Sequence, residues 1–181
     1  LANCIERGRL APAVIVGRDL MIGYRDTELA AAVGAMLATL RPAYYLKLAL
    51  TGTDELEAAL GATAQLVGRP GIGRPQLESL RAGFAAELAK RLTRQTATTL
   101  QALVQRVPDQ PDLTRWRAAV EVAAQRAGLL VSGELAAAVR MLSTETSATG
   151  RRPNQRVQDL VSYSVSPEYF AARTHLGVAI R

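Results

Sequence analysis

Apolar residues recur at helical spacing along most of this 181-residue chain. Positions three or four apart share one face of an α-helix, so a run of apolar residues at this spacing predicts a helix with a buried face. Such runs, each bounded by glycine, proline or polar residues, occupy about 26–40, 53–67, 75–92, 96–107, 112–130, 133–142, 157–161 and 166–178. The pattern therefore predicts a mainly α-helical fold.

Local signals refine this pattern at both ends of the chain. Asp26 is a suitable cap for the first long helix, and Ser166 followed by Pro167 is a typical helix start. The segment at about 12–17 is rich in β-branched residues, which favour extended structure. We therefore expect a short strand there, with room for a short β-hairpin near the N-terminus.

Two segments break the helical pattern. The run Gly68–Pro75 contains three glycines and two prolines but lacks the Gly-Lys-Ser/Thr ending of a phosphate-binding loop, so it is predicted to be a connector. The Ser, Thr and Gly-rich stretch at about 144–153 predicts an exposed, flexible loop. Otherwise the pattern is continuous, and we expect one globular domain over 1–181.

The composition is that of a globular protein, with 49% hydrophobic and 21% charged residues. No apolar run reaches the roughly 18 to 20 residues that a membrane-spanning helix needs. The chain begins with Leu1 and shows no basic segment followed by an apolar one, as a signal peptide would. We therefore expect a soluble, cytoplasmic fragment of a larger protein.

A net charge of +6 raises the question of nucleic-acid binding. The densest group of cations comprises Arg81, Lys90, Arg91 and Arg94, but acidic residues are interspersed along the same helices. Aromatic residues make up only 4% of the chain, too few for a platform on which bases stack. These features argue against a nucleic-acid interface, and the arginine-rich, lysine-poor composition also fits a GC-rich bacterial genome.

Cysteine and histidine are almost absent. Cys4 and His175 are the single residues of their types, which excludes a disulfide within the chain and the usual Cys/His zinc sites. A Cys4 nucleophile would need a nearby base, and His175 lies at the opposite end of the sequence. We expect Cys4 to be an inert thiol and His175 to lie at the surface near a helix C-terminus.

Three segments together resemble a known enzyme family. Glu28–Leu40 reads E-L-A-A-A-V-G-A-M-L-A-T-L, Glu121–Gly128 reads E-V-A-A-Q-R-A-G, and the preceding strand-like segment Ala13–Leu20 reads A-V-I-V-G-R-D-L. Their order and spacing resemble the HtpX-like and CAAX prenyl protease-type zinc metallopeptidases, which are gluzincins. The resemblance covers about residues 12–142 and implies a zincin-like helical core.

The resemblance also implies that the metal site has been lost. The His-Glu-x-x-His positions of the family correspond to Ala35, Met36 and Thr39, which cannot hold zinc or activate water in the usual way. Glu121 corresponds to the third zinc ligand, and Gln125 replaces the aspartate that orients the site. Glu121 is then either a relic of an active-site cleft or part of a structural salt bridge with an arginine.

These observations predict no metal, no cofactor and no catalytic residue. The favoured function is a non-catalytic, pseudo-metallopeptidase interaction or scaffolding domain of a larger bacterial protein, with a protein or other domains of the same polypeptide as partner. Two alternatives stay open: a peptidase-like hydrolase with an unrecognised site, and a basic helical adaptor that binds nucleic acid. An unrelated helical domain with an alanine-rich core would also carry the same small apolar residues.

Overall fold

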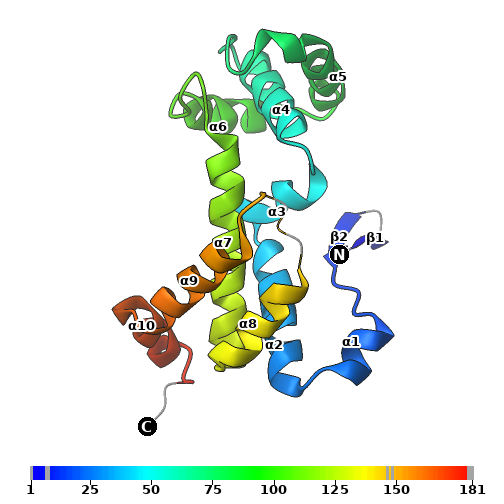
Figure 1. Cartoon of the computed structure of the whole chain (residues 1–181). Helices are drawn as coiled ribbons and strands as arrows, with labels where there is room; N and C mark the ends of the chain where they lie inside the picture. The colour runs from blue at the N-terminus through cyan, green and yellow to red at the C-terminus, as the bar shows by residue number, and fades with distance from the viewer. Residues whose placement is uncertain (1, 7–8, 146, 148, 179–181) are drawn as a thin grey trace. The chain divides into compact units, whose positions relative to one another are not determined.

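A computed structural model describes residues 2–6, 9–145, 147 and 149–178, with side chains from residue 13 onward. The chain is mostly helical, as predicted (Figure 1). Its described helices are α1 (Arg18–Gly23), α2 (Asp26–Thr39), α3 (Pro42–Ala49), α4 (Thr53–Leu66), the 3₁₀ helix η1 (Pro75–Leu77), α5 (Glu78–Ala89), α6 (Arg94–Val104), α7 (Leu113–Ser132), α8 (Leu135–Thr144), α9 (Pro153–Ser164) and α10 (Pro167–His175).

The N-terminal segment forms a short antiparallel hairpin. Strand β1 (Ala2–Glu6) pairs with β2 (Arg9–Ala13), and the register places Ala2 opposite Ala13. The strand predicted at about 12–17 therefore ends earlier than expected. Gly17 is the N-cap of α1, so the chain leaves the strand at Ala13 and enters a helix at Arg18.

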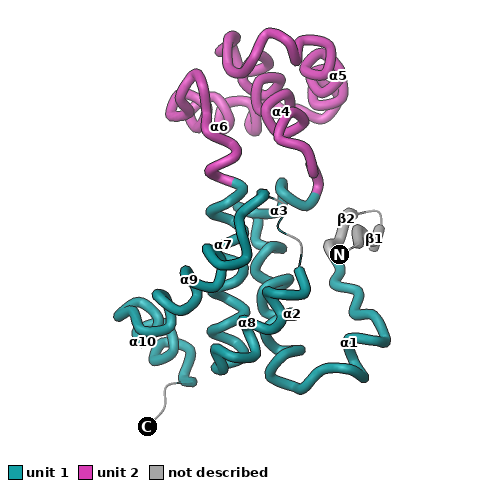
Figure 2. Tube along the Cα trace, in the orientation of Figure 1, with its two compact units in different colours: residues 1–48, 117–181 teal, residues 49–116 magenta. Residues whose placement is uncertain are grey.

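The contacts within the chain group its residues into two compact units, coloured separately in Figure 2. Unit 1 contains residues 1–48 and 117–181, and unit 2 contains residues 49–116. The prediction of a single globular domain stays a prediction. Among the described helices, none by itself has the length and hydropathy to cross a bilayer. Helices α2 and α3 reach that length and hydropathy only when they are taken together, and they meet at a bend of 95°.

The core of unit 1 is formed by side chains of α2, α7, α8, α9 and α10. Its buried members are Ala31, Ala32, Leu129, Ala138, Met141, Leu142, Leu160 and Tyr169. Several of these are alanines, which allow helices to approach closely. The closest approach is at Gly128 of α7, where an added Cβ would lie 2.5 Å from the carbonyl oxygen of Ala31. Glycine is therefore required at this crossing of α2 and α7.

Unit 2 is built from α4, η1, α5 and α6 around a small core of Ala64, Val67, Ile72 and Val104. The predicted connector Gly68–Pro75 joins α4 to η1, and Gly68, Gly71 and Gly73 have positive φ. It is more than a surface linker, because Ile72 is only 1% exposed. Arg69 Nη1 also donates to the carbonyl oxygen of Val107 at 2.6 Å, which ties the connector to the turn that follows α6.

The two predicted helix starts have different outcomes. Ser166 caps α10 as expected, since its Oγ accepts a hydrogen bond from the Tyr169 N–H at 3.2 Å. The prediction that Asp26 caps the first long helix was wrong, because Arg25 is the N-cap of α2 and Asp26 lies in the first turn. The Arg25 N–H is satisfied instead by Glu28, whose Oε2 accepts it at 2.8 Å. The carboxylate of Asp26 remains well placed to interact with the helix dipole.

Substituting Ser166 by alanine is expected to lower the free energy of unfolding by about 1 kcal/mol, because it removes the acceptor of a helix N-cap. Urea unfolding followed by circular dichroism would measure the change. Ser79→Ala is the matched control, since Ser79 is an exposed residue inside α5. Equal stability changes in the two variants would show that the cap contributes nothing.

Candidate functional site

The five positions singled out by the sequence lie on two neighbouring helices of unit 1. Ala35, Met36 and Thr39 belong to α2, and Glu121 and Gln125 belong to α7. The two helices run in opposite directions (Figure 1). Ala35 and Gln125 line one small cavity of about 20 Å³. Thr39 lies one helical turn after Ala35 in α2, and Glu121 lies one helical turn before Gln125 in α7. Because the two helices are antiparallel, Thr39 and Glu121 are displaced from the cavity in the same direction.

The three α2 positions offer no group for a metal ion. Ala35 carries only a methyl group, which packs near Gly128. The Thr39 hydroxyl donates to the carbonyl oxygen of Met36 at 2.6 Å and so bonds to its own helix. The Met36 thioether is a soft ligand that zinc rarely uses in proteins. The residues present at these α2 positions therefore do not fit the zinc site of the family that the chain resembles.

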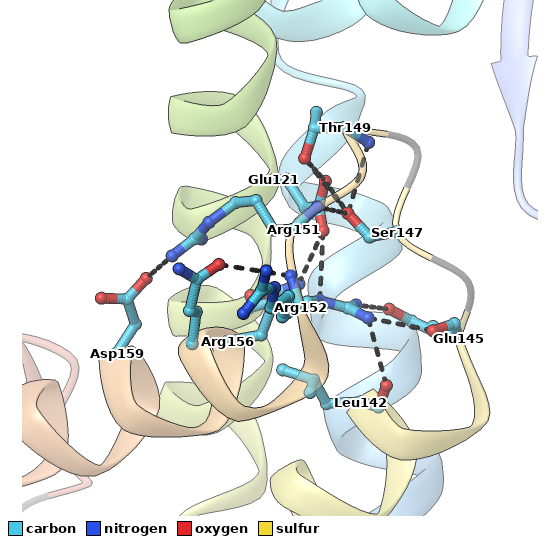
Figure 3. A network of polar contacts seen from close by, with 11 residues as sticks. Glu121, Leu142, Glu145, Ser147, Thr149, Arg151, Arg152, Arg156 and Asp159 are labelled. Carbon is cyan, nitrogen blue, oxygen red and sulfur yellow. Dashed lines mark hydrogen bonds and ion pairs between the residues drawn. The ribbon is translucent and has the colours of Figure 1, made fainter.

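Glu121 is buried, at 7% exposure, and both of its carboxylate oxygens are engaged (Figure 3). Oε1 forms an ion pair with Nε of Arg156 at 3.1 Å. Oε2 accepts hydrogen bonds from Thr149 Oγ1 at 2.7 Å and from Ser147 Oγ at 3.2 Å. Glu121 is thus the acceptor at the centre of a polar network, in line with the structural salt bridge that was one of its two predicted roles.

Arg156 of α9 is the cation of this network and is only 2% exposed. Its Nη1 donates to the carbonyl oxygens of Glu145 at 2.9 Å and Leu142 at 3.4 Å, and its Nη2 donates to Glu145 Oε2 at 3.2 Å. The guanidinium carries only donors, so the amide oxygen of Gln125 faces it and accepts from Nη2 and Nε at 2.9 and 3.0 Å. All sides of this buried cation are therefore hydrogen-bonded.

The loop between α8 and α9 supplies part of the network. Its bounds agree with the loop predicted at about 144–153, while residues 146 and 148 lie outside the described part. Ser147 and Thr149 are half-buried and not fully exposed as expected, because their hydroxyls satisfy Glu121. Arg151 forms an ion pair with Asp159 of α9. The predicted flexibility of the loop stays a prediction.

Two charged residues at the network have shifted pKa values, namely Glu145, which binds Arg156, and Lys47. Burial raises the pKa of Glu145 above its ordinary value, and this effect is opposed by the positive charge of Arg156. Burial lowers the pKa of Lys47, on α3, although the negative charge of Glu121 opposes that shift. Both directions indicate that solvent around the network is limited. The network therefore combines two carboxylates with several cations in a partly desolvated place.

Replacing Glu145 by glutamine is expected to change how stability depends on pH. The raised pKa in the folded state means that folded Glu145 keeps its proton to a higher pH than the unfolded chain does. The free energy of unfolding of the wild type, relative to Glu145→Gln, should then fall as pH rises from about 4.5 through the raised pKa, and be constant above it. Urea titrations of both proteins between pH 4 and pH 8 would measure this difference, and a difference that grows with pH would contradict it.

The network is suited to holding helices together, and its central pair, Glu121 and Arg156, is engaged within the protein. An arginine guanidinium does not release its proton in proteins, and the Glu121 carboxylate is already bound on both oxygens. Within residues 2–6, 9–145, 147 and 149–178, no three Asp, Glu, His or Cys side chains gather into a metal-binding group. His175 is exposed at the end of α10, as predicted, and the side chain of Cys4 lies outside the described part.

Sequence reasoning missed Arg156. A usable signal was present, because Arg156 lies four residues before Leu160 and therefore on the buried face of α9. An arginine on an apolar helix face needs a buried acid or several carbonyl groups as partners. Glu121, an acid among the apolar residues of α7, is the residue that could be expected to pair with such an arginine.

The cations of the densest basic stretch do not form a single patch. Arg81 is buried, and its Nη2 donates to the carbonyl oxygen of Arg74 at 3.0 Å. Lys90 forms an ion pair with Glu87 at 2.5 Å. Arg91 and Arg94 are exposed. Arg81 and Lys90 are therefore engaged in contacts within unit 2.

Comparison with known proteins gives no matching family model, no matching curated protein and no matching solved structure. The resemblance to the metallopeptidases stays a prediction that rests on the residues quoted for it.

Proposed function

We propose that this chain is a non-catalytic interaction or scaffolding domain with a pseudo-metallopeptidase arrangement, in which the Arg156 guanidinium takes the place of a metal cation. The observation that carries the proposal is the state of Glu121. The resemblance makes this residue a zinc ligand, and here its oxygens bind Arg156, Ser147 and Thr149. Three of the roughly four acceptor sites of this carboxylate are therefore occupied by donors of the protein itself, and both of its oxygens are engaged.

The exchange of a metal for arginine is physically reasonable. A buried carboxylate is costly unless an opposite charge and hydrogen bonds compensate it, and either a metal ion or a guanidinium can do so. Arg156 brings several donors in a fixed plane and thereby also binds carbonyl groups at the end of α8. The result links α7, α8 and α9, which is a structural gain.

The surface of unit 1 supports a role in binding a protein. The last two helices and the turns that follow them expose several large apolar side chains, namely Val161, Val165, Phe170 and Leu176. Exposed apolar residues that lie on adjoining elements are typical of surfaces that contact other proteins. In the proposed function, the partner is another domain of the same polypeptide or a separate protein.

Rebuilding the metal site tests the proposed relationship. Ala35→His with Thr39→His places two imidazoles one turn apart on α2, and Arg156→Gln removes the competing charge while keeping N–H donors for the carbonyl groups. In this triple variant Glu121 should become a third ligand. We expect it to bind zinc at least about tenfold more tightly than a two-histidine site does. A chelator-competition titration on protein shown by circular dichroism to be folded measures this affinity.

The control is Ala82→His with Ala86→His in the same Arg156→Gln background. These two exposed positions of α5 have the same spacing as Ala35 and Thr39 but belong to unit 2, whereas Glu121 belongs to unit 1. Equal zinc affinity of the two histidine pairs, or no effect of adding Glu121→Gln, would argue that these positions do not form the frame of a metal site.

A further inference from the structure

Unit 2 contains an apolar cavity of about 150 Å³ where α4, α5 and α6 come together. Four leucines form most of its wall, and Arg91 and Thr96 lie at the cavity as well. The leucines are Leu66, Leu88, Leu92 and Leu100. Leu88 is 37% exposed, so the cavity reaches the surface of the unit.

The size and lining of this cavity favour an apolar guest. Leucine side chains offer water no hydrogen-bond partners, so water in this open cavity is readily displaced, and an apolar volume of about 150 Å³ is large enough for benzene. A guest that fills it would bury the leucine side chains that water now contacts, and this burial is the main driving force for such binding. The volume suits one aromatic ring or a short alkyl chain.

The rim of the cavity is positively charged. Arg91 is exposed, and its guanidinium forms no hydrogen bond or ion pair with any described residue. The nearest acid in the sequence, Glu87, is paired with Lys90. Helix α6 begins at Arg94, capped by Thr93, and the positive end of its dipole adds to the potential at this rim. A free cation beside an apolar hollow is the pairing that an amphiphilic anion requires.

We propose that this cavity binds a small organic carboxylate, with the apolar body among the leucines and the carboxylate paired with Arg91. The site lies within unit 2, and it is independent of the Glu121 network and of the function proposed for that network. Arg91 sets the preference for an anion, and the leucines set the size of the apolar group.

The test compares two probes that differ only in charge and polarity at one end, 3-phenylpropionate and 3-phenylpropanol. Each is titrated into the full chain labelled with ¹⁵N, and binding is followed by amide chemical shifts. We expect 3-phenylpropionate to bind about three- to fivefold more tightly than the alcohol, as for an exposed ion pair. The shifts should centre on the amides of Leu66, Leu88 and Leu100.

Two variants decide between this proposal and general attraction of anions. Arg91→Gln should remove the preference for the carboxylate and leave the affinity for the alcohol unchanged. Arg106→Gln, which changes an exposed arginine of the same unit that does not line the cavity, should change neither affinity. Filling the cavity with Leu88→Trp should abolish binding of both probes. Absence of shifts at the leucines, equal affinity for the two probes, or equal losses in Arg91→Gln and Arg106→Gln would each overturn the proposal.

Discussion

Replacing Arg156 with methionine is expected to lower the free energy of unfolding by about 3 to 5 kcal/mol, because it leaves the buried carboxylate of Glu121 without its counter-charge. The same change removes the donors that bind the carbonyl oxygens of Leu142 and Glu145. Methionine replaces the aliphatic part of the arginine side chain and keeps most of its packing, so loss of the charge and the donors dominates the effect. Urea unfolding at pH 7, followed by circular dichroism, measures the change.

The double variant Glu121→Met with Arg156→Met is the control for this interpretation. Replacing both members of a buried ion pair by apolar residues is often neutral, since the cost of desolvating two charges disappears together with their attraction. We therefore expect the double variant to recover at least half of the stability lost in Arg156→Met. A single variant within about 0.5 kcal/mol of the wild type would mean that the ion pair does not hold unit 1 together.

Gly128→Ala is expected to lower the free energy of unfolding by about 2 kcal/mol, because the core between α2 and α7 has no room for a methyl group. The added Cβ would lie 2.5 Å from the carbonyl oxygen of Ala31 and 3.3 Å from Cβ of Ala35. The first of these contacts is with backbone, which cannot rotate away. The helices must therefore separate, and thermal or urea unfolding detects the loss.

Gly83→Ala provides the matched control for Gly128→Ala. Gly83 also lies inside a helix, and a Cβ there meets nothing within 4 Å. Alanine at this position should raise the free energy of unfolding by about 0.5 to 1 kcal/mol through its better helix propensity. If both glycine variants were stabilised, the close approach of α2 and α7 would be wrong.

The sequence predicted the helices because local rules dominate there. The spacing of Leu29, Val33 and Met36 follows one helical face, and the Ser166 cap acts through atoms three residues away. The short segment at 44–48 follows Pro42 and carries too few positions for a helical pattern to be read from it. It is part of α3, which starts at Pro42, and proline is well suited to the first turn of a helix.

The polar network could be predicted only in part. The apolar neighbours of Glu121 indicated burial and an arginine partner, but the partner lies 35 residues later in the chain. Which of many arginines meets Glu121 depends on how α7 and α9 pack, and this is a tertiary property that periodicity does not encode. The same holds for Ser147 and Thr149, whose composition indicated an exposed loop and whose hydroxyls bind a buried acid.

The division of the chain into two units could not be predicted from the hydrophobic pattern either. The helical runs of 49–116 resemble those on either side in spacing and composition, so nothing local separates them. The connector Gly68–Pro75 illustrates the reason. Its glycines predicted turns, and the burial of Ile72 among them depends on contacts with helices distant in sequence.

The metal content of the purified chain, prepared without chelator, tests the central claim most directly. That claim is that an internal guanidinium occupies the place of a metal beside Glu121. Elemental mass spectrometry should then find no stoichiometric zinc, and the melting temperature should be the same before and after addition of a chelator. One zinc ion per chain, together with a melting temperature that falls when the chelator is added, would contradict the account.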